Sequence, residues 1–307
     1  MPQFLRRIAR PVRAAWWLAL VLVGTGCSAQ ASPATPVDDR PLVLTTFSVL
    51  ADLAGTVGGD HVRVESITKV GAEIHGYEPT PSDLVRAQEA DLILDNGLGL
   101  ERWFERFLNS VEAPHAVLSD GVEPVAIRSG DYAGRANPHA WMSPLAARTY
   151  VDNTVQALTG LAPEHAADFE ANGRELKDEL TDLLQDFRAE IASIDSAALV
   201  TCEGAFSYLA RDAGLEEAFI WPVNADSEGT PRQIRDVIGF VQEHDVPTLF
   251  CESTVDPSAQ EQVALASGAE LGGTLYVDSL SAADGPVPTF LDLIRYDLQT
   301  IAEGLAR

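Results

Sequence analysis

Short apolar runs alternate with amphipathic stretches from Leu42 to the C-terminus, and this alternation predicts strands followed by helices. In the first half the runs that predict strands are Leu42–Phe47, Val62–Thr68, Ala90–Leu94 and Ala116–Leu118. In the second half they are Ala197–Thr201, Ala218–Trp221, Thr248–Cys251 and Thr274–Val277. Strands that alternate with helices are typical of parallel sheets covered by helices, so we expect an α/β fold.

One long helical pattern separates the two halves. A helix is predicted after Pro144, and from Pro163 to Ile194 apolar residues recur at steps of three and four: Leu176, Leu180, Leu183, Leu184, Phe187, Ile191 and Ile194. Such a helix is about 45 Å long, and it can be either a surface helix or a strut that joins two lobes. We expect two open-sheet lobes with a cleft between them: an N-terminal lobe (42–160), a linking helix (161–195) and a C-terminal lobe (196–307).

The first 26 residues have the pattern of a signal peptide. Four arginines precede an apolar run from Ala14 to Val23, which is too short to span a bilayer. The sequence Gly24-Thr25-Gly26-Cys27 resembles a bacterial lipobox, although Gly24 stands where an aliphatic residue is usual. We expect a lipid anchor on Cys27 and a flexible tether over 27–41; ordinary secretion after Ala31 is the alternative.

Composition adds a strong negative charge to this outline. The 307 residues carry a formal charge of −25, and the leader contains four of the 21 basic residues and no acidic one. A field of this sign repels phosphate backbones, so nucleic acid is not an expected partner. With 46% hydrophobic residues the chain can bury a globular core.

Four polar residues lie where predicted strands end or a helix begins, and ligands of open α/β sheets bind at the carboxyl ends of strands. His75 follows the second strand, His139 precedes the helix at Pro144, Glu203 follows the strand Ala197–Thr201, and Asp278 follows Thr274–Val277. Two imidazoles and two carboxylates form a donor set suited to a first-row divalent ion. From position alone, each residue can equally be an ordinary polar group of a loop or helix cap.

Five segments of the chain resemble the metal-binding lipoproteins of ATP-binding-cassette importers, the cluster A-I solute-binding proteins. They are Glu73–Asp83 (EIHGYEPTPSD), Asn96–Glu101 (NGLGLE), Asn137–Trp141 (NPHAW), Glu203–Tyr208 (EGAFSY) and Tyr276–Leu280 (YVDSL). The resemblance implies that His75, His139, Glu203 and Asp278 bind the metal in the cleft between the lobes. It also implies a receptor, not an enzyme, that delivers its ion to a permease driven by a cytoplasmic ATPase.

The resemblance is strongest to the manganese and iron branch of this family. The zinc branch usually has a third histidine where Glu203 stands and often a His-rich loop, whereas Val122–Ala136 contains no histidine. We therefore expect Mn²⁺, with Fe²⁺ and Zn²⁺ as alternatives, although Zn²⁺ can bind at least as tightly in vitro. Binding is expected to weaken as the pH falls through the histidine range near about 6.5.

Other readings stay open beside this one. A surface zinc metallohydrolase could use the same four residues, but it would need a solvent-reachable coordination position and a substrate pocket. Glu252 ends the strand Thr248–Cys251 and could replace Asp278 as a ligand. Cys202 and Cys251 end two strands of an exported protein and can pair if those strands are neighbours; two buried thiols are the alternative. We expect a monomer on the outer face of the cell membrane, or a soluble secreted or periplasmic protein if Cys27 is not lipidated.

Overall fold

The computed structural model describes residues 38–104, 111–128, 130, 132–194, 197–223 and 229–307. The predicted signal peptide, Cys27 and most of the tether lie outside these residues. Residues 40–307 form one compact unit. In the described part of the chain, no helix combines the length and the apolar character needed to cross a bilayer.

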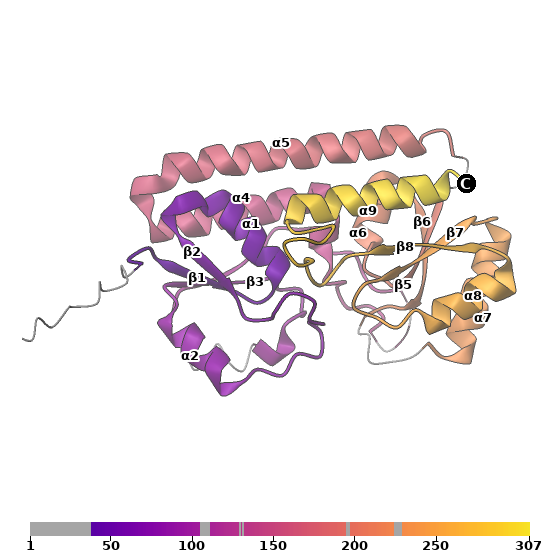
Figure 1. Ribbon diagram of the computed structural model, residues 1–307, viewed down its shortest axis with the longest axis horizontal. Coiled ribbons are helices and arrows are strands. Elements are labelled where there is room, and N and C mark those ends of the chain that lie inside the picture. The colour runs from indigo at the N-terminus through magenta and orange to yellow at the C-terminus, as the bar shows by residue number, and fades with distance from the viewer. Residues whose placement is uncertain (1–37, 105–110, 129, 131, 195–196, 224–228) are drawn as a thin grey trace, which may run out of the picture. The chain divides into compact units, whose positions relative to one another are not determined.

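The first half contains a four-stranded parallel sheet, as the alternating pattern predicts (Figure 1). The strand order is β2-β1-β3-β4, with β1 paired to β2 and β3, and β3 paired to β4, always in parallel. All residues of β1 and β3 are buried, which explains their continuous apolar runs. The elements are β1 (Leu42–Thr45), α1 (Ser48–Gly58), η1 (Gly59–His61), β2 (Arg63–Ser66), α2 (Pro81–Glu89), β3 (Leu92–Asp95) and β4 (His115–Val117).

Two long helices connect the halves. They are α4 (Pro144–Leu161), preceded by the short η2 (Ala140–Met142), and α5 (Ala166–Ile191), preceded by η3 (Pro163–His165). Pro163 begins the separate turn η3, so α5 is about 39 Å long and shorter than the pattern predicts. The predicted stripe faces the core through Leu176, Leu180, Leu184, Phe187 and Ile191. In Figure 1, α5 runs beside α4 and α9, and it also packs against α1.

The second half repeats the strand-helix alternation, with strands paired two by two. β5 pairs with β6 and β7 with β8, both in parallel. The elements are β5 (Ala198–Glu203), α6 (Ser207–Ala213), β6 (Glu216–Trp221), α7 (Pro231–Glu243), β7 (Thr248–Glu252), α8 (Ser258–Ser267), β8 (Glu270–Leu275) and α9 (Phe290–Leu305). The α/β fold with parallel strands and a long helix is therefore confirmed.

A disulfide bond joins the two strand pairs. It links Cys202 in β5 to Cys251 in β7, with the two Cα atoms 4.9 Å apart, which confirms the pairing inferred from the strand ends. One cluster of buried side chains extends from Val43 in β1 to Leu305 in α9 and includes the buried face of α5. The domain limits 42–160, 161–195 and 196–307 stay a prediction.

Candidate metal centre

The four residues singled out from the sequence converge in the folded chain. His75 lies in the loop between β2 and α2, and His139 lies directly before η2. Glu203 is the last residue of β5, and Asp278 lies three residues beyond the end of β8. One donor atom of each side chain lies within 4.8 Å of the donor atoms of the others. We call this group the interlobe cage.

Distances within the interlobe cage suit a single ion. His75 Nε2 lies 3.0 Å from His139 Nε2, 3.3 Å from Glu203 Oε1 and 3.8 Å from Asp278 Oδ1. His139 Nε2 lies 3.6 Å from the same oxygen of Glu203. Donors bound at about 2.1 Å around a tetrahedral ion lie about 3.4 Å from one another. The donor atoms thus occupy positions that one cation can bridge.

Burial makes this arrangement costly for the side chains alone. The side chains of His139, Glu203 and Asp278 are at most 1% exposed, and that of His75 is 5% exposed. Among the described residues, no hydrogen bond reaches Asp278 Oδ1, while Thr254 donates a hydrogen bond of 3.2 Å to Oδ2. A buried, charged carboxylate needs hydrogen bonds or a positive group to compensate for the lost water, and without them it takes up a proton.

The electrostatics of the interlobe cage separate its two histidines. Burial tends to lower the pKa of His75, but the carboxylates of Glu203 and Asp278 outweigh it and raise this pKa to about 9. Burial lowers the pKa of His139 to about 3; the charge of Glu203 opposes this lowering and His75 adds to it. Burial and the charge of Glu203 raise the pKa of Asp278 to about 7. The carboxylates therefore decide the pKa of His75 and burial decides that of His139, so the two pKa values depart in opposite directions from the range near about 6.5.

Asn137 fixes the orientation of His139. Its Oδ1 accepts the main-chain N–H of His139 at 3.0 Å and lies 2.9 Å from Nδ1 of the same ring. This contact places the proton on Nδ1 and leaves Nε2 free to face the other donors. Asn137 Nδ2 donates to the carbonyl oxygen of Gly204 at 2.6 Å, so the residue also ties the loop of His139 to the loop after Glu203.

Trp141 makes a second bond between the halves. Its indole N–H donates to the carbonyl oxygen of Val277 at 3.2 Å, directly before Asp278. The ring is fully buried and packs against Phe47 and His139, with centroids 5.0 and 5.2 Å away. Trp141 is thus a packing residue that also holds the main chain next to Asp278.

A buried network supports the loop of His139 from the first half. Gly97, Leu98 and Gly99 have φ angles of 79°, 54° and 78°, a left-handed run that costs little at the two glycines and is strained at Leu98. This turn lets Glu101 accept the main-chain N–H groups of Asn96 and Gly97 at 2.7 and 3.2 Å. Asn96 Nδ2 in turn donates to the carbonyl oxygen of Pro138 at 3.0 Å. The segment NGLGLE therefore positions the residue before His139.

Glu252 lies behind Glu203 and does not replace Asp278. Both of its carboxylate oxygens accept the main-chain N–H of Glu203, at 3.3 and 3.2 Å. Glu252 is 2% exposed, and burial together with the charge of Glu203 raises its pKa well above the usual value. The cysteines beside it are joined in the disulfide and offer no thiolate. Glu252 is therefore a positioning residue for the end of β5.

One hollow in the surface borders the interlobe cage. A hollow of about 340 Å³ opens beside His75 and is lined also by Leu98, Arg102, Tyr132 and Arg135. Of the four residues of the interlobe cage, His75 is in the described lining of this hollow.

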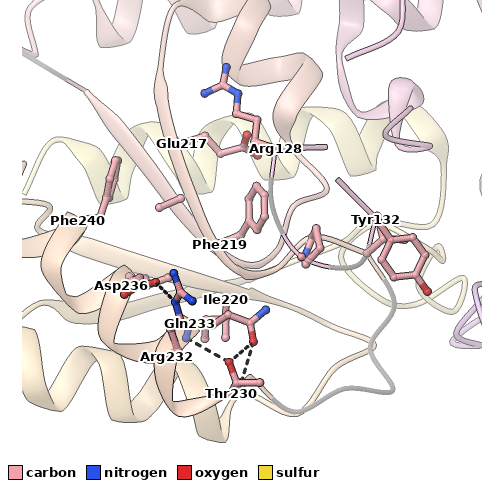
Figure 2. Close-up of a pocket in the computed structure, with 15 residues that line it drawn as sticks. Arg128, Tyr132, Glu217, Phe219, Ile220, Thr230, Arg232, Gln233, Asp236 and Phe240 are labelled. Atoms are coloured by element: carbon pink, nitrogen blue, oxygen red, sulfur yellow. Dashed lines mark hydrogen bonds and ion pairs between the residues drawn. The ribbon is translucent and has the colours of Figure 1, made fainter. Parts of the chain in front are cut away.

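A larger hollow of about 740 Å³ lies between β6 and α7 (Figure 2), and the interlobe cage contributes no residue to its described lining. Arg128 lies beside Glu217 there, and Ser207 donates hydrogen bonds of 3.0 and 2.8 Å to the Glu217 carboxylate. Arg232 pairs with Asp236 at 3.6 Å. Among the described residues, the lining of this hollow contains no group of three side chains that could hold a metal ion, so it is not the candidate metal centre.

Known proteins similar in sequence to this chain are named for metal binding or metal uptake. Residues 43–304 match the family model described as ZnuA, zinc-uptake complex component A, periplasmic. The chain is 45% identical to the iron-binding protein YfeA of Yersinia pestis over 93% of both chains. It is 32% identical to the manganese ABC transporter substrate-binding lipoprotein PsaA of Streptococcus pneumoniae, over 95% of this chain and 97% of that protein.

Solved structures are similar as well. A Mn-bound periplasmic metal-binding protein from Candidatus Liberibacter asiaticus has a TM-score of 0.81 and 36% identity, covering 87% of this chain and 100% of that one. The periplasmic zinc-binding protein TroA from Treponema pallidum has a TM-score of 0.80 over the same share of both chains. At 24% identity it supports the fold alone.

Proposed function

The chain belongs to the ZnuA family of periplasmic metal-uptake components, and from this premise we propose that it is an extracytoplasmic receptor for a divalent transition metal ion. The receptor captures one ion and delivers it to the permease of an ATP-binding-cassette importer, which a cytoplasmic ATPase drives. Members of this family are solute-binding receptors, and the chain is accordingly a receptor and not an enzyme.

The observation that carries the proposal is the convergence of four buried donors from both halves of the chain. His75, His139, Glu203 and Asp278 bring one donor atom each to within 4.8 Å of the others. Two neutral imidazoles and two carboxylates compensate a 2+ charge without further anions. A cation also relieves the repulsion between the buried carboxylates, which otherwise raises the pKa of Asp278 together with burial.

We propose Mn²⁺ as the cargo. Two of the four donors are carboxylate oxygens, the ligand type that suits manganese, and no third imidazole stands at Glu203. The similarity to PsaA and to a Mn-bound periplasmic protein supports this choice. Iron is the second candidate, favoured by the 45% identity to a protein named for iron binding.

Burial argues against the zinc metallohydrolase. Hydrolysis at a metal needs an open coordination position and a substrate pocket next to it. The donor side chains of the interlobe cage are at most 5% exposed, and those of His139, Glu203 and Asp278 at most 1%. These features suit an ion held by protein atoms alone.

We propose that Cys27 carries a lipid and anchors the protein to the outer face of the membrane as a monomer. The lipobox-like sequence before Cys27 and the lipoprotein names of several relatives support this. Labelling of the expressed protein with radioactive palmitate tests it. Wild type should be labelled and Cys27→Ala should not; an unlabelled wild type would favour soluble secretion.

The cargo is tested by titrating metal-free protein. Calorimetric titrations with Mn²⁺, anaerobic Fe²⁺ and Zn²⁺ should each show one tight site, and elemental analysis of protein from its native host should find manganese. His139→Gln and Asp278→Asn should each weaken Mn²⁺ binding by more than ~100-fold, about 3 kcal/mol. His244→Gln is the matched control, because His244 stacks on Phe240 of α7, outside the interlobe cage. Unchanged affinity in both site variants would refute the proposed ligands.

A further inference from the structure

A second group of metal-binding side chains lies outside the interlobe cage, at the N-terminal end of α5. His61 of η1, His165 of η3 and Asp168 of α5 each place one donor atom within 4.8 Å of the others. We propose that this group, here called the helix-end cluster, is a second metal site that binds ions preferring imidazole, of which Zn²⁺ is the representative. It shares no residue with the interlobe cage.

The two imidazoles already lie side by side. The rings of His61 and His165 are stacked, with centroids 3.8 Å apart and planes inclined by 16°. His61 Nε2 lies 2.9 Å from Asp168 Oδ2. Rotation of the two rings out of their stack, for which their partial exposure leaves room, would turn one nitrogen of each toward a common ion at about 2.1 Å.

The main chain that carries these donors is held firmly. Phe169, next to Asp168 and fully buried, packs edge-on against both rings at centroid distances of 5.8 and 6.3 Å. One turn further along α5, Asn172 donates to the carbonyl oxygen of Val57 in α1 at 3.0 Å and ties α5 to the segment before His61. Segments far apart in sequence thus present their donors from fixed positions, which lowers the ordering cost of binding.

Exposure distinguishes the helix-end cluster from an ordinary buried contact. The side chains of His61, His165 and Asp168 are 29%, 36% and 62% exposed, so an ion can reach them from solvent. Glu164 is also exposed, and its Oε1 lies 4.0 Å from His165 Nε2, where it can act as a fourth donor. Water can complete the coordination shell.

The donor set selects among metals. Two imidazoles and one or two carboxylates follow the Irving–Williams order, so Zn²⁺ binds more tightly than Mn²⁺. In the interlobe cage, burial leaves the carboxylates without water, so a bound ion is strongly favoured. The helix-end cluster is exposed, and water competes there with a weakly bound ion. We therefore expect a weaker zinc site that manganese does not fill.

The experiment counts zinc ions in the mature protein. Titration of the metal-free chain with Zn²⁺ at pH 7.5 should give two binding events, and titration with Mn²⁺ only one. The double variant His61→Gln/His165→Gln should lose the weaker zinc event and keep the tight one, which also shows that it folds. His244→Gln should keep both, as a histidine outside either site.

A second readout uses Co²⁺ as a spectroscopic probe. Once the interlobe cage is disabled by Asp278→Asn, the visible absorption of bound Co²⁺ should persist. Addition of Asp168→Asn to this variant should weaken Co²⁺ binding by at least ~10-fold. Only one zinc event in wild type, or a second event that survives the double histidine variant, would mean that His61 and Asp168 form a surface ion pair and nothing more.

Discussion

Nδ1 of His139 lies 2.9 Å from Oδ1 of Asn137, and that oxygen also accepts the main-chain N–H of His139. The contact fixes which nitrogen of the ring faces the other donors. Outer partners of this kind typically change metal affinity by about 10- to 100-fold when they are removed.

Asn137→Ala should therefore weaken Mn²⁺ binding by ~10- to 100-fold, because the ring of His139 loses its tautomer and its orientation. Calorimetric titration of the metal-free variant measures the change. Asn153→Ala is the control, since Asn153 also donates to two main-chain carbonyls, those of Leu118 and Asp120, away from the interlobe cage. Equal Mn²⁺ affinities in the two variants would contradict a role of Asn137 in orienting His139.

Glu203→His should move the metal preference from manganese toward zinc. The change replaces a carboxylate oxygen with an imidazole nitrogen, which zinc favours more than manganese does. The ratio of the Kd for Mn²⁺ to the Kd for Zn²⁺ should rise by at least ~10-fold in calorimetric competition. Glu243→His, at an exposed end of α7, controls for the mere addition of a histidine. An unchanged ratio would contradict our account of selectivity.

Metal affinity should rise with pH between about 7 and 9. The pKa of His75 is raised to about 9 in the metal-free protein, so below this pH the ion must displace the proton of His75. The affinity should increase up to about tenfold per pH unit and level off above about 9. Titrations in buffers of different ionisation enthalpy at pH 8 should show about one proton released per ion.

The control for proton release is His115→Gln. Hydrogen bonding to Asp95 raises the pKa of His115, but this pair lies on β4 and β3, outside the interlobe cage. The variant should release as many protons as wild type. Affinity that does not depend on pH between 7 and 9 would show that His75 is neutral before the ion binds.

Breaking the disulfide should affect both stability and binding. Cys202 and Cys251 are 49 positions apart, and a crosslink over such a loop stabilises a fold by about 2–5 kcal/mol. The variant Cys202→Ser/Cys251→Ser should show this loss in urea unfolding of the metal-free protein. Mn²⁺ affinity should also fall, because Cys202 directly precedes Glu203. Identical unfolding curves for oxidised, reduced and double-variant protein would exclude a stabilising role.

Much of the fold could be predicted because buried parallel strands leave continuous apolar runs. All eight strands expected from such runs are present, with ends shifted by a few residues. β8 begins at Glu270, earlier than the predicted Thr274. The prediction missed this start because the first residues of β8 are largely exposed and include Gly272 and Gly273, which add no apolar side chain to the pattern. The pairing of β5 with β6 and of β7 with β8 depends on contacts between segments and leaves no local pattern.

The four candidate ligands could be predicted from the sequence, but the residues that orient them could not. Strand ends and the family motifs select His75, His139, Glu203 and Asp278, and the structure brings these four together. The role of Asn137 was not predicted, and the sequence allows Glu252 as a ligand in place of Asp278, whereas Glu252 accepts the main-chain N–H of Glu203. Their function depends on which atom faces which neighbour, and only the folded chain determines that.

The hydrogen bonds from Asn137 to Gly204 and from Trp141 to Val277 have a consequence for transport. They join the two halves at the loops that carry the proposed ligands His139, Glu203 and Asp278, and neither bond involves the ion. The two halves are therefore already joined before the ion binds, so loading does not need to bring them together. Separation of the two halves for release would break both hydrogen bonds, at a cost of about 1 kcal/mol each that ATP hydrolysis on the far side of the membrane can supply.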